Sequence, residues 1–255
     1  MSSLTLYHHP LSVCSMKVRL ALEEKELVWN SRVIDIVQSQ EQLEPWYVEL
    51  NEKGVIPTLL IEKSENEVIT DSARIIRYIA SIPEGKSLIP DNSGSLQVME
   101  ALIDMADNID LQILSYARHP SMEKSEGILN KRIEIALDRA EKYPQLKERY
   151  HICAERSVTA KQFRTDDVHI GAVERYAFES LRSIDRKLDG NTFLLGDTYS
   201  LADVIWTVVL SRLDLLGYDS WLQGEAFPLL SEYYQRVQNR KSYTQAQIQN
   251  RWWEK

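Results

Sequence analysis

The sequence predicts two domains of different class, an α/β domain followed by an all-helical domain. Short β-branched and apolar runs that favour strands occur only in the first third of the chain. Beyond residue 94, apolar residues recur at helical spacing and such runs disappear. Residues 83–94 are rich in Pro, Gly and polar side chains, as a linker is. We therefore expect domains at residues 1–82 and 95–255, joined by a linker at residues 83–94.

The bulk composition is that of a folded globular protein, and it argues against a nucleic-acid binder and a membrane-spanning protein. Hydrophobic residues make up 44% and charged residues 27% of the 255 residues, so a sizeable core can be buried. The net charge of −8 and the lack of a dense Lys/Arg block exclude a typical nucleic-acid binder. The most apolar segment, residues 204–218, is too short and too charged to span a bilayer.

Cysteine usage and the first residues bear on cellular location. Cys14 and Cys153 are the two cysteines, and two cannot build a disulfide scaffold, which favours a reducing compartment. The first ten residues lack the basic start and long apolar stretch of a signal peptide. We therefore expect a cytoplasmic protein.

The expected α/β domain begins with a strand and a helix. Leu4–Tyr7 forms a short strand, and His8-His9-Pro10 makes a turn after it. Residues from about Ser12 to Lys25 favour a helix, because Ala, Leu, Glu and Lys dominate its end and apolar residues recur at helical spacing. A second strand is expected at Arg32–Ile36.

Two further strands and a helix complete this domain. Thr58–Glu62 and Val68–Thr70 are separated by a short polar turn, and that spacing predicts a hairpin. A helix then begins at Asp71 or Ser72 and continues to about Ala80.

The second half carries two apolar stripes at helical spacing and a charged, helix-permissive segment at residues 121–165. The first stripe comprises Met99, Leu102, Ile103, Ala106, Ile109, Ile113, Leu114 and Ala117. The second comprises Ile170, Val173, Ala177, Leu181, Ile184 and Leu188. The aromatic end, Arg251-Trp252-Trp253, is expected to pack on this helical domain.

The first motif that could carry chemistry is Ser12-Val13-Cys14-Ser15, at the predicted junction of the first strand and helix. A helix N-terminus presents unpaired N–H groups and a positive dipole end, which acidify the thiol of a cysteine or of a bound ligand. Alternatively, Ser12 is an N-cap and Cys14 a small buried apolar residue. Taken alone, the four residues favour this structural interpretation.

The second motif is Val55-Ile56-Pro57-Thr58, just before the third strand. With a cis bond before Pro57, the N–H and C=O of Ile56 would turn outward and pair with an extended peptide, as a sheet edge does. An ordinary trans proline at the start of a strand is the commoner alternative.

The third motif is Thr70-Asp71-Ser72, at the start of a predicted helix. Helix N–H groups could bind the carboxylate of an amino-acid head group, while Asp71 binds its ammonium. A plain N-cap is the alternative, and the tripeptide alone favours it.

Ser200-Leu201-Ala202-Asp203 precedes an apolar helix and reads as a capping box with a structural role. The five histidines show no metal-ligand spacing on one helix face, so no metal site is expected. No Gly-rich phosphate loop and no Ser/His/Asp arrangement stands out.

In their order along the chain, these features resemble the cytosolic glutathione transferases. Residues 12–17, 50–59, 140–144 and 199–208 are similar to the tetrachlorohydroquinone dehalogenase-like and zeta-like members. Met16-Lys17 stands where zeta enzymes usually carry Trp-Arg, which argues against zeta-type maleylacetoacetate isomerisation.

The resemblance implies a thioredoxin-like glutathione-binding domain, an all-helical domain that contributes the electrophile pocket, and glutathione as co-substrate. Ile56 would pair with the cysteinyl backbone of glutathione and Pro57 would fix the turn. Asp71 and Ser72 would hold the γ-glutamyl end. Weaker candidates are Gln42 and Lys53 for the glycyl carboxylate, and Tyr116 and Trp206 for the pocket between the domains, where core packing is an equal alternative.

A comparison of free energies assigns Ser12 to the activation of the glutathione thiol. A free thiol has a pKa of about 8.5, and lowering it by about two units requires roughly 2.7 kcal/mol. A helix dipole supplies about 0.3–1 kcal/mol and at most about 2. One charge-assisted hydrogen bond of about 1.5–3 kcal/mol closes the gap, and a hydroxyl donates better than a thiol.

Cys14 is thereby free for a second role. In dehalogenase-like relatives, the matching cysteine forms a mixed disulfide with glutathione, which a second glutathione resolves. We therefore expect a transferase acting on a small hydrophobic electrophile, with reductive dehalogenation of a halogenated quinol as the specific hypothesis. A glutathione-dependent thiol reductase or isomerase, and a non-catalytic binding module, are the alternatives. A homodimer is the family expectation.

Overall fold

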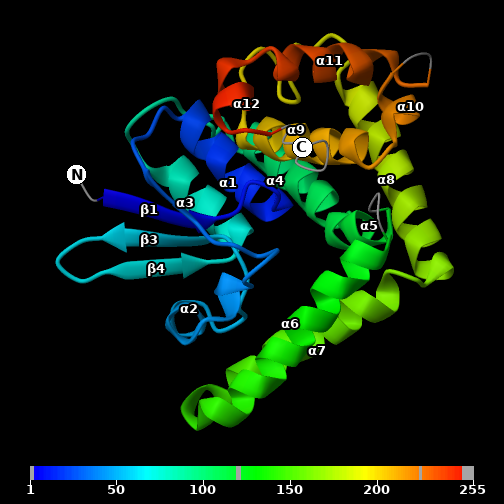
Figure 1. Cartoon of the computed structure of the whole chain (residues 1–255). Helices are drawn as coiled ribbons and strands as arrows, with labels where there is room; N and C mark the ends of the chain where they lie inside the picture. Colours follow the sequence, from blue (N-terminus) through cyan, green and yellow to red (C-terminus); the bar gives the residue numbers. More distant parts are fainter. Residues whose placement is uncertain (1–2, 119–121, 224–225, 249–255) are drawn as a thin grey trace.

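A computed structural model describes residues 3–118, 122–223 and 226–248 of the chain (Figure 1). Its mixed sheet has the strand order β2-β1-β3-β4, with β1 at Ser3–His8, β2 at Asn30–Val33, β3 at Thr58–Glu62 and β4 at Glu67–Thr70. β2 runs parallel to β1, because a helix connects them. β3 is antiparallel to β1, and β4 is antiparallel to β3.

Three helices belong to the sheet-containing part: α1 (Val13–Glu24), α2 (Pro45–Leu50) and α3 (Ser72–Ser81). α1 and α3 pack against each other, and α3 also contacts β3 and β4. α2 follows the short 3₁₀ helix η1 (Glu41–Leu43) and lies apart from α1 and α3, below the sheet in Figure 1. The buried face of the sheet is thus covered by α1 and α3.

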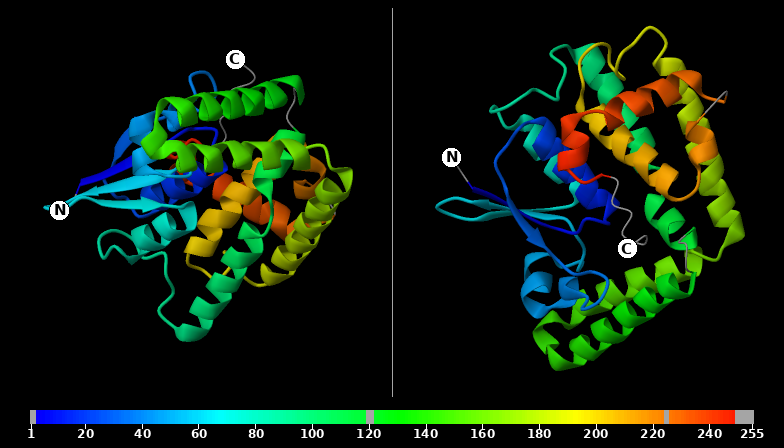
Figure 2. Two further views of the ribbon diagram at one scale, coloured as in Figure 1. Left: turned by 90° about the horizontal axis from the view of Figure 1, so that it is seen from below. Right: turned by 45° about the horizontal axis from the view of Figure 1, so that its top comes forward.

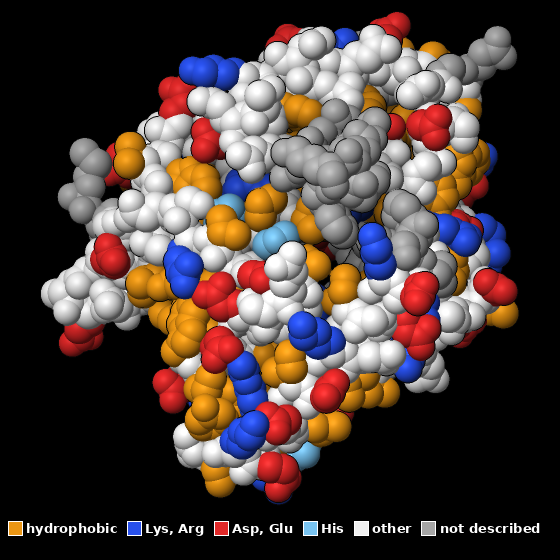
Figure 3. Space-filling model, viewed as in Figure 1, with side chains coloured by type: hydrophobic (Ala, Val, Ile, Leu, Met, Phe, Trp, Pro, Cys, Tyr) orange, Lys and Arg blue, Asp and Glu red, His pale blue; other side chains and the backbone are white. Residues whose placement is uncertain are grey.

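The remaining elements are helical. They are α4 (Ser93–Asp107), α5 (Leu111–Ala117), α6 (Met122–Lys142), η2 (Pro144–Leu146), α7 (Lys147–Phe163), α8 (Asp167–Lys187), α9 (Leu201–Leu215), α10 (Asp219–Leu222), α11 (Pro228–Gln238) and α12 (Lys241–Gln245). α6 and α7 lie side by side as a projecting arm in both figures (Figures 1 and 2). Acidic and basic side chains are interspersed over this arm (Figure 3).

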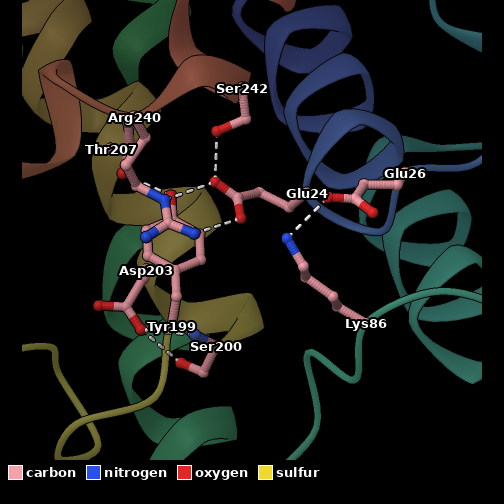
Figure 4. A network of polar contacts seen from close by, with 9 residues as sticks. All are labelled: Glu24, Glu26, Lys86, Tyr199, Ser200, Asp203, Thr207, Arg240 and Ser242. Carbon is pink, nitrogen blue, oxygen red and sulfur yellow. Dashed lines mark hydrogen bonds and ion pairs between the residues drawn. The ribbon is translucent and has the colours of Figure 1, made fainter.

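α9 is the central helix of the molecule. Every residue from Leu201 to Leu213 is buried, and the helix packs against both α1 and α4. The predicted capping box opens it, since Asp203 Oδ2 accepts from the backbone N–H of Ser200 at 2.8 Å. Asp203 Oδ1 accepts from the hydroxyl of Tyr233 at 2.9 Å, so this carboxylate also joins α9 to α11. Figure 4 shows the N-terminal end of α9 beside the C-terminal end of α1.

The second strand begins two residues and ends three residues earlier than predicted, at Asn30–Val33 instead of Arg32–Ile36. Its end is set by Asp35, whose carboxylate accepts from the backbone N–H groups of Val37, Gln38 and Ser39. These hydrogen bonds turn the chain and offer the backbone an alternative to the sheet.

The first apolar stripe of the helical half occupies two helices and not the single one predicted. α4 ends at Asp107, and Asp110 then acts as a new N-cap by accepting from the N–H of Ile113 at 2.9 Å. α2 was not predicted, although Pro45 at its first position is a recognised start signal. By contrast, β3 and the helix after β4 lie within one residue of their predicted bounds.

Several further points follow from the described residues. α8 carries the second apolar stripe on its buried face, as predicted. No helix in the described ranges is long and apolar enough to cross a bilayer. The C-terminal residues Arg251–Trp253, expected to pack on the helices, lie outside the described residues.

Candidate active site at the start of α1

Ser12 is the N-cap of α1. Its backbone is extended, with φ −74° and ψ 120°, and its Oγ accepts from the N–H of Ser15 at 3.2 Å. The preceding loop is tight, because the N–H of Ser12 donates to the carbonyl of His9 at 3.1 Å. Since Oγ serves the helix as an acceptor, the hydroxyl proton stays available for a ligand.

Cys14 occupies the first turn of α1, two residues after the cap, and its side chain is exposed. Its interpretation as a small buried apolar residue is therefore wrong. Cys153 is the buried cysteine: it lies on α7, and burial raises the pKa of its thiol to about 11. Of the two thiols, that of Cys14 is the one open to solvent and next to a helix N-terminus.

The Ile56–Pro57 bond is cis. Tyr47 and Asn51 hold the preceding residue, since the hydroxyl of Tyr47 and the amide of Asn51 both donate to the carbonyl of Val55, at 2.9 and 2.8 Å. No residue in the described part of the chain hydrogen-bonds to the N–H or C=O of Ile56. The backbone of Ile56 is therefore free to pair with an extended ligand.

Asp71 is the N-cap of α3, and Ser72 is the first residue of the helix. The Oδ1 atom of Asp71 accepts from the N–H groups of Ala73 and Arg74, at 2.9 and 3.2 Å. The φ of Asp71 is +82°, a conformation that side chains with a Cβ rarely adopt. The side chain is exposed, so one carboxylate oxygen still faces outward while the other caps the helix.

Sheet register brings these three motifs to the same end of the sheet. Tyr7 of β1 pairs with Thr58 of β3, and Thr58 pairs in turn with Thr70 of β4. The β1–α1 loop, the segment before β3 and the start of α3 therefore lie at the same end of these strands. Ser12, Cys14, Ile56, Pro57, Asp71 and Ser72 all belong to these segments.

Two neutral histidines stabilise the loop before α1. Burial lowers the pKa of His8 to about 4, and its Nε2 lies 2.8 Å from the hydroxyl of Ser31. Burial also lowers the pKa of His9, whose Nδ1 accepts from the N–H of Leu11 at 3.2 Å. Both rings therefore act as uncharged hydrogen-bonding groups.

The C-terminal part of the chain also holds this loop. Arg19 of α1 donates to the carbonyls of His9 and Pro10, each at 3.2 Å, and to the carbonyl of Ala246 at 2.8 Å. Lys17, which stands where zeta enzymes usually carry arginine, pairs with Asp107 of α4 at 2.5 Å. These two cations anchor α1 to the helical part.

The remaining candidates differ in placement. Trp206 is fully buried and donates to the carbonyl of Leu102, so it packs in the core. Tyr116 is half-buried, and its hydroxyl accepts from Arg132 at 2.7 Å. Gln42 is buried with its amide donating to Gln40, whereas Lys53 is exposed.

Sequence reasoning missed Arg212. Its side chain reaches from α9 to the carbonyl of Leu11, to which Nη2 donates at 2.6 Å. An arginine within a mostly apolar segment is the signal that could have found it, because an arginine is rarely buried without a polar partner.

Comparison with known families decides the identity. Residues 11–82 match the glutathione S-transferase N-terminal domain, and residues 159–236 match the glutathione S-transferase C-terminal domain. The chain belongs to the glutathione S-transferase family. The predicted fold class, enzyme class and co-substrate are thereby confirmed: this is a transferase-type enzyme that uses glutathione.

Individual relatives of this glutathione S-transferase include dehalogenases. It is 32% identical over 252 residues to a tetrachloro-p-hydroquinone reductive dehalogenase of Sphingobium chlorophenolicum, covering 99% of this chain and 98% of the relative. It is 26% identical to a 2,5-dichlorohydroquinone reductive dechlorinase of Sphingobium indicum, covering 96% and 82%. A solved structure, the beta-etherase LigF from Sphingobium sp. strain SYK-6, has a TM-score of 0.76 at 20% identity, covering 96% and 98%.

No group of three or more His, Cys, Asp or Glu side chains is placed to hold a metal ion in the part of the chain that the structure describes.

Proposed function

We propose that this enzyme removes a halogen reductively from a halogenated quinol, with glutathione as reductant and Cys14 as a covalent nucleophile. The observation that carries the proposal is the exposed thiol of Cys14 in the first turn of α1, two residues after the capping hydroxyl of Ser12. Full-length similarity to a reductive dehalogenase gives further support.

In the first step, the thiolate of glutathione replaces a halide on the ring carbon of the electrophile. Ser12 donates its hydroxyl proton in a hydrogen bond to the sulfur of glutathione, which favours the thiolate. The carbon–halogen bond breaks, halide leaves with its electron pair, and a glutathionyl conjugate results.

In the second step, the thiolate of Cys14 attacks the sulfur of that conjugate. A sulfur–sulfur bond to Cys14 forms, and the carbon–sulfur bond breaks with its electron pair going to the ring carbon, which then takes up a proton. The carbon is reduced and the two sulfurs are oxidised to a mixed disulfide. A second glutathione thiolate attacks this disulfide, which releases oxidised glutathione and restores the thiolate of Cys14.

Glutathione would lie along the end of the sheet where the three motifs meet. We assign Ile56 to backbone pairing with its cysteinyl part, Pro57 to the turn, and Asp71 with Ser72 to its γ-glutamyl end. The unpaired backbone of Ile56 and the outward carboxylate oxygen of Asp71 support this orientation. Lys53 is the better-placed partner for the glycyl carboxylate, because Gln42 is buried.

The same proposal divides the chain by task. Residues 1–82 bind glutathione, residues 83–94 link the domains, and residues 95–255 contribute the electrophile pocket. Two unpaired cysteines support a cytoplasmic location. Family membership supports a homodimer, which light scattering on purified protein tests.

Mass spectrometry of the intact protein tests the proposal. After incubation with glutathione and a chlorinated hydroquinone, a glutathione adduct is expected on the peptide that contains Cys14. The Cys14→Ser variant is expected to accumulate the glutathionyl conjugate of the quinol and to release no reduced product. Dechlorinated product from Cys14→Ser at the wild-type rate would contradict the covalent role. An adduct formed equally well from oxidised glutathione, without any dechlorination, would instead indicate a thiol reductase.

A further inference from the structure

We infer that Arg19 of α1 positions the hydroxyl of Ser12 for glutathione, because it binds the loop before α1 to the turn that follows α12. The inference rests on the proposed hydrogen bond from Ser12 to the sulfur of glutathione. It adds to that step a buried guanidinium and a turn from the other end of the chain. Arg19 is thereby a positioning residue, which acts on the ligand only through Ser12.

The end of β1 and the loop before α1 provide three of the acceptors for the guanidinium of Arg19. Nη1 and Nη2 donate to the carbonyls of His9 and Pro10, each at 3.2 Å. Nη1 also lies 3.3 Å from Nδ1 of His8. Because a guanidinium can only donate, Nδ1 is the accepting nitrogen of the neutral His8 ring. Arg19 therefore binds three consecutive residues that lead into α1.

The turn after α12 provides the two remaining acceptors. Nε of Arg19 donates to the carbonyl of Ala246 at 2.8 Å, and Nη2 donates to the carbonyl of Gln247 at 3.5 Å. Ala246 and Ile248 are fully buried, and α12 packs against α1, so this turn belongs to the core. An arginine carries five N–H groups in a rigid planar fork, and here each of them has an acceptor. The loop and the turn are therefore held at a fixed separation.

The charge of Arg19 is satisfied by carbonyl groups and not by a carboxylate. Arg19 is 2% exposed, and none of the ion pairs in the described ranges includes it. Burial lowers the pKa of Arg19 to about 10, so the guanidinium stays charged at neutral pH. A buried cation is costly unless polar groups satisfy it. The loop and the turn are thus both required around this guanidinium, and a side chain without its planar fork would no longer join them.

The carbonyl of His9 connects the guanidinium with Ser12. It accepts from Nη1 of Arg19 at 3.2 Å and from the backbone N–H of Ser12 at 3.1 Å. On its other side, Ser12 accepts from the N–H of Ser15 through Oγ at 3.2 Å. The direction in which the hydroxyl of Ser12 faces therefore depends on where Arg19 holds the carbonyl of His9. Because Arg19 is buried, it acts through this carbonyl and not on the ligand.

The pKa of the glutathione thiol in its complex with the enzyme tests the inference, measured from the ultraviolet absorbance of the thiolate against pH. Because no quinol is present, the result is independent of the proposed dehalogenation. Arg19→Lys keeps the charge but loses the planar fork, so it should raise this pKa by about one unit. It should lower kcat for conjugation about tenfold at neutral pH and change KM for glutathione less than about threefold. A merely structural role would reduce the fraction of active enzyme but leave the pKa of the bound thiol unchanged.

Gln247→Pro disturbs the same contact from the C-terminal side and covers the case in which Arg19→Lys does not fold. Proline cannot adopt the φ of +52° found at Gln247. It also disfavours the helical conformation of the preceding Ala246, with φ −73° and ψ −2°. The two carbonyls that Arg19 binds should turn away, and the pKa of the bound thiol should again rise by about one unit. Gly190→Pro is the matched control, because Gly190 follows α8 with a φ of +70° in an open turn, and it should leave this pKa unchanged.

Ser12→Ala provides the reference for both variants. It should raise the pKa of the bound thiol by itself, and Gln247→Pro should then add no further shift in that background. A raised pKa in Ser12→Ala with an unshifted pKa in Arg19→Lys and Gln247→Pro would overturn the inference alone, as would additive shifts in the double variant. An unshifted pKa in Ser12→Ala would refute the role of Ser12 in the proposed function, and the inference with it.

Discussion

In the proposed mechanism Ser12 performs two tasks with one hydroxyl, and this explains why its role is ambiguous in the sequence. Its oxygen caps α1, and its proton remains available for the sulfur of glutathione. Both the structural and the chemical interpretation of the motif are therefore compatible with its geometry. For Cys14 the two interpretations exclude each other, and its exposure rules out burial in the core.

Substitutions at Ser12 separate the two tasks. Ser12→Ala should cost about 1 kcal/mol of stability through the lost cap and lower kcat/KM for glutathione conjugation by about 10- to 100-fold. Ser12→Asp keeps an acceptor for the N–H of Ser15, so its stability should approach that of wild type, but it has no hydroxyl proton to donate. Urea unfolding and a conjugation assay measure the two effects. Wild-type conjugation by Ser12→Asp would exclude donation by Ser12.

Sequence motifs identified the candidate residues that belong to short local patterns and missed a residue that makes its contact across the fold. Ser12, Ile56 and Asp71 each belong to a short pattern with a recognisable cap or turn. Arg212 acts on a loop at the other end of the chain, and no spacing rule connects the two. Only the packing of α9 against α1 reveals the contact.

At the scale of elements, the predicted bounds differ from the structure where a carboxylate accepts hydrogen bonds from the backbone and so interrupts a strand or a helix. Asp35 ends β2 early and Asp110 starts a new helix within an unbroken apolar stripe. In both cases apolar periodicity continued while a carboxylate redirected the chain. β3 and α3, which have proline or aspartate at their start, lie close to the predicted positions.

The N-terminus of α3 allows the cap and the proposed ligand contact to be distinguished. Asp71→Asn keeps an acceptor for the N–H groups of Ala73 and Arg74 and tolerates positive φ, so the free energy of unfolding should change by less than about 0.5 kcal/mol. It removes the negative charge proposed to bind the ammonium of glutathione, so KM for glutathione should rise about tenfold.

Asp71→Ala serves as the comparison, because it loses cap and charge together and should also lose about 1 kcal/mol of stability. Steady-state kinetics and chemical denaturation of both variants give the required numbers. An unchanged KM in Asp71→Asn would show that the residue is only a cap.

At the scale of the whole molecule, the two parts are joined by a buried ion pair as well as by α9. Glu24 at the end of α1 is almost fully buried, and Arg240 binds both of its carboxylate oxygens, at 2.7 and 2.6 Å (Figure 4). The hydroxyl of Ser242 also donates to Glu24. The guanidinium of Arg240 lies 4.0 Å from the centre of the ring of Tyr199.

Removing one partner of this ion pair should destabilise the protein far more than removing both partners. Arg240→Met leaves the carboxylate of Glu24 buried and unpaired, which should cost about 3 kcal/mol in the free energy of unfolding. The double variant Glu24→Gln with Arg240→Met should recover a substantial part of that loss. Urea denaturation of the two single variants and the double variant gives the coupling, and strict additivity would show that the pair does not hold the domains together.

The overall arrangement could be predicted because the order of motifs along the chain is specific, although each motif is weak. Contacts between the two parts could not be predicted, since they join residues such as Glu24 and Arg240 or Leu11 and Arg212. Such pairs depend on how helices dock, and apolar periodicity gives the buried face of a helix but not its neighbour.

The contact between Arg212 and Leu11 has a consequence for the order in which the protein is made. A ribosome releases the segment with Cys14 early and α9 only after most of the chain has emerged. Until α9 docks, the carbonyl of Leu11 lacks this donor, so the start of α1 gains this hydrogen bond late in synthesis.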